Sequence, residues 1–85
     1  MFTDVKPDTL KRILRDNVRR RREELGISQN KLAGMLDVDQ TTIQKFEAGK
    51  HSISIELLAK LAEVLDVSAD SLLAIRRTAR KAAAV

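Results

Sequence analysis

The sequence predicts an all-α fold of five short helices in a single domain, and two observations carry this prediction. Apolar residues recur at steps of three and four along nearly the whole chain, the spacing that gives a helix one apolar face. One proline, three glycines and two aromatic residues leave no segment typical of a strand. The 85 residues suit one domain, with residues 1–75 as its body and the basic residues 76–85 as a tail or an extension of the last helix.

The first helix is expected to begin at Pro7, because proline suits the first helical position, and to end where Gly26 stops it. The apolar face of this helix comprises Leu10, Ile13, Leu14, Val18 and Leu25. The second helix is expected after the cap residue Ser28, and the third after the cap residue Asp39, ending at Gly49. The side chains expected to face inward from these two helices are Leu32, Met35, Leu36, Ile43 and Phe46.

Ser54 and Ser68 are expected to cap a fourth and a fifth helix. The apolar residues of these helices are Leu57, Leu58, Leu61, Leu65, Leu72 and Ile75. Residues 32–38 (LAGMLDV) recur as residues 61–67 (LAEVLDV), at a spacing of 29. We interpret this echo, a short repeated segment, as two helices that end in the same way before a capped helix begins. We do not interpret it as a structural repeat, since repeat arrays need about three units.

Charge is distributed unevenly along the chain, whose formal net charge is +4. Residues 1–26 carry eight basic against five acidic side chains and residues 71–85 four against none, whereas residues 27–70 carry four against seven. Basic flanks suit a DNA backbone, RNA or an anionic membrane equally well. Charge alone therefore indicates only a polyanionic partner.

Residues 29–46 have the spacing of a tight helix-turn-helix, in which two or three residues join the helices. Ala33 is small where the two helices approach most closely, and Val38 joins the apolar wedge between them. The turn favours a glycine because it needs a positive φ, and this sequence has Asp37 there instead.

Four segments in this order resemble the Cro/CI-type (XRE) family of phage repressors and bacterial regulators, from about Val18 to Leu73. They are Arg22-x-x-Leu25-Gly26-Ile27-Ser28-Gln29, Leu32-Ala33, residues 43–50 (IQKFEAGK) and residues 61–68 (LAEVLDVS). The resemblance implies a five-helix, lambda-repressor-like fold whose second and third helices form the helix-turn-helix. It also implies binding to double-stranded DNA.

The third helix supplies the candidate base contacts, which are Gln40, Thr41, Gln44 and Lys45. On a helical period Thr41, Gln44 and Lys45 point away from the Ile43 and Phe46 stripe, and Gln40 falls in the exposed first turn. Gln, Thr and Lys can all bond base edges in the major groove. The resemblance matches Gln40, Thr41 and Lys45 to the family's usual base-contacting positions. The alternative is a solvated helix face with no DNA role.

The candidate phosphate contacts are Ser28, Gln29, Thr42, Lys50 and His51. Gln29 falls in the first turn of the second helix, where backbone N–H groups and the helix dipole favour an anion. Ser28 has an alternative role as a cap, and His51 as an ordinary loop residue. The family often has a polar or basic residue where this sequence has Ala48, so one expected phosphate contact is missing.

Arg22 falls on the apolar face of the first helix, where a partly buried guanidinium needs a carboxylate. Glu47 falls on the inner side of the third helix, and the resemblance matches these two positions to an ion pair between helices 1 and 3. We predict a structural ion pair between Arg22 and Glu47. The preceding arginines 19–21 are expected either at the DNA or as a solvated helix end.

These features predict a transcriptional regulator, a repressor by preference, that binds a two-fold symmetric operator as a homodimer. Two alternatives remain open: an antitoxin that autoregulates its operon and neutralises a toxin, and an interaction adaptor that keeps the fold without DNA binding. Polymerase is a further possible protein partner. The apolar residues proposed for the dimer interface, or else for the core, are Ile53, Ile55, Leu72, Leu73 and Ile75.

The sequence argues against an enzyme, since no motif pairs a nucleophile with a base, no phosphate-binding loop is present and there is one histidine. Because cysteine is absent, neither a disulfide nor a thiolate metal site is possible, and we predict no metal and no cofactor. The first residues lack the pattern of a signal peptide and no stretch suits a membrane span, so a cytoplasmic protein is expected.

Overall fold

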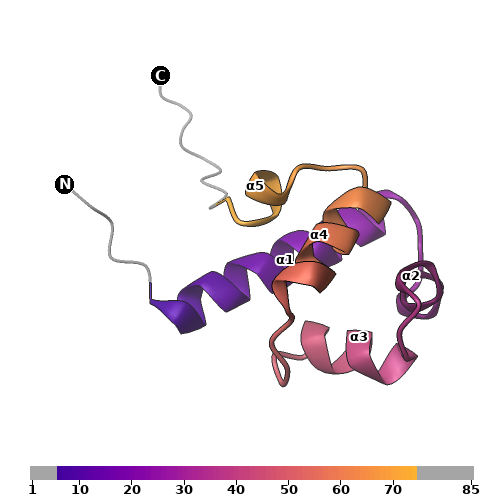
Figure 1. The fold of residues 1–85 in the computed structure, drawn as a ribbon, viewed down its shortest axis with the longest axis horizontal. Coiled ribbons are helices and arrows are strands. Elements are labelled where there is room, and N and C mark those ends of the chain that lie inside the picture. Colours follow the sequence, from indigo (N-terminus) through magenta and orange to yellow (C-terminus); the bar gives the residue numbers. More distant parts are fainter. Residues whose placement is uncertain (1–5, 75–85) are drawn as a thin grey trace.

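The computed structural model describes residues 6–74, which form five helices and contain no strand. The helices are α1 (Pro7–Glu24), α2 (Gln29–Leu36), α3 (Gln40–Glu47), α4 (Ile55–Val64) and α5 (Ala69–Leu72). The predicted all-α class is therefore confirmed (Figure 1). Ile75 and the basic tail at 76–85 lie outside the described residues. No helix within residues 6–74 has the length and apolarity that a membrane crossing requires.

Three of the four predicted caps form as expected, because a serine hydroxyl accepts a hydrogen bond from the first turn of its helix. Ser28 accepts from the backbone N–H of Lys31 at 3.0 Å, and Ser54 from that of Leu57 at 3.0 Å. Ser68 caps α5 in the same way. Asp39 stands at the N-cap position of α3 but its side chain makes no capping hydrogen bond, so the expectation of a cap there is wrong.

The echo between residues 32–38 and 61–67 is a repeated way of ending a helix. Asp37 and Asp66 both adopt the left-handed conformation, with φ of 60° and 58°. In both places the next residue donates its N–H back into the helix at 3.0 Å, Val38 to the Ala33 carbonyl and Val67 to that of Ala62. The helices that follow differ, since α3 has eight residues and α5 has four.

The core lies between the five helices, with α1 packed against α3 and α5, α2 against α3 and α4, and α4 against α5. Its buried apolar side chains are Leu14, Val18, Leu32, Ala33, Leu36, Ile43, Phe46, Leu61, Ala62, Leu65 and Leu72. In Figure 1 the first turns of α1 extend past the other helices, while α2 and α3 lie together at the opposite end of the molecule.

Three residues expected in the core are exposed instead. Met35 is 42% exposed. The inward face of α2 is formed by Leu32, Ala33 and Leu36, and the helical period turns position 35 away from that face. Leu10 is 39% exposed because it lines an open hollow, together with Ile53 and Leu58. Leu25 is 41% exposed at the C-cap, beyond the last helical residue.

Candidate nucleic-acid interface

The outer side of α3 carries polar side chains, while the inner side of the same helix packs in the core. Ile43 and Phe46 are 1% and 3% exposed, so the helix is held on its inner face. The four predicted base-contacting residues are all exposed: Thr41, Gln44 and Lys45 lie on the other face, and Gln40 lies in the first turn of the helix. This arrangement leaves donors and acceptors in water on a helix that cannot rotate without unpacking the core.

A hydrogen-bonded carboxylate fixes α3 to the two preceding helices. Arg22 of α1 donates to Glu47 of α3 through two contacts, Nε to Oε2 at 2.8 Å and Nη2 to Oε1 at 3.0 Å. Gln29 of α2 donates from Nε2 to the same Oε1 at 2.9 Å. Arg22 also donates to the Ile27 carbonyl at 2.9 Å, which joins the loop before α2 to the same group. The predicted partners therefore meet, as part of a larger network.

The electrostatics of Glu47 favour its charged form. Burial raises the pKa of the Glu47 carboxyl, but the hydrogen bonds from Arg22 and Gln29 and the charge of Arg22 outweigh burial and leave that pKa below its ordinary value. The hydrogen bond to Glu47 raises the pKa of Arg22. Both groups are therefore charged at neutral pH, as an ion pair that is mostly withdrawn from solvent requires.

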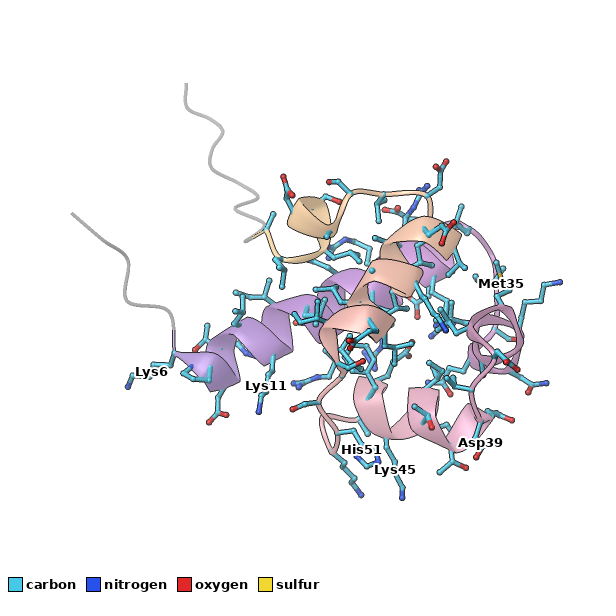
Figure 2. The ribbon with its side chains drawn as sticks, in the orientation of Figure 1. Lys6, Lys11, Met35, Asp39, Lys45 and His51 are labelled. Atoms are coloured by element: carbon cyan, nitrogen blue, oxygen red, sulfur yellow. The ribbon has the colours of Figure 1, made fainter. Side chains whose placement is uncertain are left out.

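The predicted phosphate contacts lie in three places in the structure. Ser28 and Gln29 stand at the start of α2, with Ser28 engaged as the cap and the Gln29 amide group bonded to Glu47. Lys50 and His51 are exposed in the loop that follows α3, while Thr42 is half-buried on α3 itself. Figure 2 shows Lys45 and His51 projecting from the same side of the molecule.

Two residues of α1 make contacts that the sequence analysis did not predict, since it gave Asn17 no role and placed Arg21 at the DNA or in a solvated helix end. Asn17 is buried and its Nδ2 donates to the carbonyls of Leu72 at 2.7 Å and Ala74 at 2.9 Å. Arg21 donates from Nε to the Leu65 carbonyl at 2.8 Å, at the end of α4. For Asn17, the sequence offered one indication of such a role, because this polar residue falls on the inward face of the first helix, directly before Val18.

The chain matches a family model described as Helix-turn-helix over residues 18–72, from the last turns of α1 through α5. A protein of Pyrococcus horikoshii named as an HTH-type transcriptional regulatory protein is 40% identical over 45 residues, 53% of this chain. A protein of Pyrococcus furiosus with the same kind of name is 36% identical over 55 residues, 65% of this chain. This chain spans only 14% and 18% of the length of these two relatives.

Solved structures with this fold include regulators and one enzyme. A hypothetical transcription factor from Neisseria has a TM-score of 0.76 and 27% identity, covering 89% of this chain and 88% of that one. The restriction-modification controller protein C.AhdI of Aeromonas hydrophila has a TM-score of 0.69 and 27% identity, over 73% and 94% of the two chains. A hydroxypropylphosphonic acid epoxidase of S. wedmorenis has a TM-score of 0.73 over 79% of this chain and 36% of the enzyme. At 24% identity, that likeness shows the fold alone.

Proposed function

The chain belongs to the helix-turn-helix family that matches residues 18–72, and we propose that it regulates transcription by placing α3 in the major groove of double-stranded DNA. The exposed row of Gln40, Thr41, Gln44 and Lys45 on a helix anchored by Ile43 and Phe46 is the observation that carries this proposal. An α-helix with its side chains is about 10–12 Å across, which suits the roughly 12 Å width of the major groove.

Within this proposal the contacts fall into two classes. The exposed side chains of α3 read base edges, and each good bidentate pair discriminates by about 1–3 kcal/mol. The start of α2 and the loop with Lys50 and His51 hold the sugar-phosphate backbone, which fixes register without reading sequence. The names of the Pyrococcus relatives and of the Neisseria structure support a regulatory role.

We further propose that the protein binds as a homodimer to a two-fold operator and acts there as a repressor. One short recognition helix reads few base pairs, and a second copy placed one helical turn away, about 10 base pairs, doubles the sequence that is read. Of the residues predicted for such an interface, Ile55 is 76% exposed and Ile53 and Leu73 are half-buried, whereas Leu72 belongs to the core.

We propose no enzymatic role. The likeness to the epoxidase covers 36% of that enzyme, and within residues 6–74 no group of three His, Cys, Asp or Glu side chains is arranged to hold a metal ion. The proposal therefore assigns binding, with no bond made or broken by this chain.

Selection of binding sites from a random duplex pool tests the proposed function. We expect one motif to be enriched at moderate salt, and the protein to bind it roughly 10³-fold or more tightly than scrambled duplex. A two-fold symmetric motif would support the homodimer. An absence of enrichment, together with weak binding to random duplex at low salt, would contradict the proposal and favour the protein-interaction adaptor.

A further inference from the structure

A shallow cavity of about 170 Å³ lies between α1 and the loop that follows α3. Its lining residues are Lys11, Leu14, Arg15, Phe46, Gly49, Lys50, His51, Ser52 and Ile53. Four of these side chains are basic, and the lining contains no aspartate or glutamate. The cavity floor is apolar and its rim is cationic, so the site favours an anion over a cation.

Four basic side chains follow one stripe along α1 and form two pairs, of which one pair has a carboxylate partner within residues 6–74. Arg19 and Arg22 approach Glu47, with N–O distances of 3.9 and 2.8 Å. Arg15 and Lys11 continue the same stripe one and two turns earlier, and within residues 6–74 neither has a carboxylate within 4.0 Å. Like charges four residues apart destabilise a helix by about 0.2–0.5 kcal/mol. A bound anion would remove that repulsion.

Arg15 lies directly against the end of α3. A Cβ atom placed on Gly49 would lie 3.0 Å from Nη1 of Arg15 and 3.1 Å from its Cζ, so the guanidinium occupies the space that a side chain there would need. Gly49 has φ of +81°, which starts the loop carrying Lys50 and His51. The guanidinium is therefore held beside that loop, and in Figure 2 Lys11 and His51 extend to the same side of the molecule as Lys45.

We propose that Lys11 and Arg15, together with Lys50 and His51, bind a phosphate of the DNA backbone next to the groove that α3 occupies. This inference rests on the proposed function. It goes beyond it because Lys11 and Arg15 precede residue 18, where the match to the family begins. The projecting first turns of α1 then extend the DNA contact outside the matched domain, and the charges at 11 and 15 strengthen binding to every sequence equally.

The test compares two double variants that remove the same charge. Lys11→Gln/Arg15→Gln removes the cavity cations, and Arg12→Gln/Lys60→Gln removes two exposed cations that do not line the cavity. Affinity for the selected duplex is measured from about 50 to 200 mM salt. The first variant is expected to bind roughly tenfold more weakly at low salt, with a log–log salt slope shallower by about 1 to 2 and an unchanged site preference. The second variant is expected to match wild type.

Equal affinities and slopes for the two double variants would overturn the phosphate site and leave the proposed function intact. Failure of the wild-type protein to bind duplex DNA would overturn both. Because Arg15 packs against Gly49, the thermal melting of each variant is recorded alongside. If Lys11→Gln/Arg15→Gln fails to melt cooperatively, the single change Lys11→Gln at an exposed position tests the phosphate site instead. We expect its log–log salt slope to be shallower by about 1, and an unchanged slope would show that the site is absent.

Discussion

Arg22 and Glu47 join α1 to α3 through two hydrogen bonds, of 2.8 and 3.0 Å. Their side chains are only 11% and 2% exposed, so the pair is screened far less than a surface ion pair. Gln29 donates to the same carboxylate. The orientation of α3 relative to α1 and α2 therefore depends on one negative charge that is withdrawn from water.

Removal of that charge should destabilise the fold. In Glu47→Ala, Arg22 keeps its charge in a poorly solvated place without its partner, and we expect the free energy of unfolding to fall by about 3 kcal/mol. For a domain of this size the melting temperature should fall by roughly 12–24 °C. Thermal melting followed by circular dichroism measures the change.

Glu24→Ala provides the matched control, because Glu24 forms an ion pair with Arg21 at 3.4 Å that is half exposed. Surface pairs of this kind contribute about 0–1 kcal/mol, so the control should melt within a few degrees of wild type. Similar melting temperatures for Glu47→Ala and wild type would show that the Arg22 pair does not hold the fold together.

The lowered pKa of Glu47 predicts a dependence of stability on pH. A glutamate in the unfolded chain has a pKa of about 4.3, whereas Glu47 in the folded protein stays ionised to lower pH. Its contribution to stability is therefore complete above the unfolded pKa. That contribution is lost as pH falls through the folded pKa. The difference in unfolding free energy between wild type and Glu47→Gln should therefore be constant above about pH 5.5 and shrink as pH falls below that value in urea titrations. The other carboxylates are common to both proteins and cancel in the difference. A difference that stays constant below about pH 5.5 would refute the assignment.

Most of the local structure could be predicted from the sequence, because a cap or a helix end depends on neighbours a few residues away. Ser28, Ser54 and Ser68 cap their helices as expected, and Asp37 takes the positive φ that the turn needs. The prediction was wrong for Met35, where a helix of eight residues has a narrower inward face than the apolar pattern suggested.

Contacts between distant segments were harder to predict, because no local pattern encodes them. The buried amide of Asn17 bonds the carbonyl of Leu72, 55 positions away, and only the tertiary fold brings the two together. Gln29 was predicted to contact a phosphate of the DNA backbone, and in the structure its amide group donates a hydrogen bond to Glu47. A change at Gln29 would therefore disturb the carboxylate network as well as any phosphate contact, so other residues are better probes of DNA binding.

Substitutions on the outer face of α3 should change which sequence is bound. Thr41 and Lys45 are exposed and oppose the buried face, so replacing either with alanine should leave folding intact. Each change should weaken the selected site by about 1–3 kcal/mol and relax the preference at one base position, with little change on scrambled duplex for Thr41→Ala. Lys50→Ala provides the control, since loss of a backbone contact weakens all sequences alike. Competition between selected and scrambled duplexes separates these outcomes, and equal losses on both for Thr41→Ala would remove it from the base contacts.

Glycine at the turn between α2 and α3 should stabilise the protein. Asp37 has φ of 60°, a conformation that costs most side chains roughly 1–2 kcal/mol and glycine almost nothing. Its charge also lies at the C-terminal end of α2, where the helix dipole disfavours an anion. The greater entropy of glycine in the unfolded chain offsets part of these gains, so we expect Asp37→Gly to raise the free energy of unfolding by up to about 1 kcal/mol.

Asp39→Gly is the matched control for this turn, because it makes the same chemical change two residues later at φ of −70°. Asp39 has no capping hydrogen bond to lose and no strain to relieve, so glycine there should lower stability by a few tenths of a kcal/mol. Asp66→Gly, at φ of 58° in the equivalent turn after α4, should repeat the gain seen at Asp37. If chemical denaturation showed Asp37→Gly to be as destabilising as Asp39→Gly, the aspartate would be making a favourable interaction in the turn that outweighs its backbone strain.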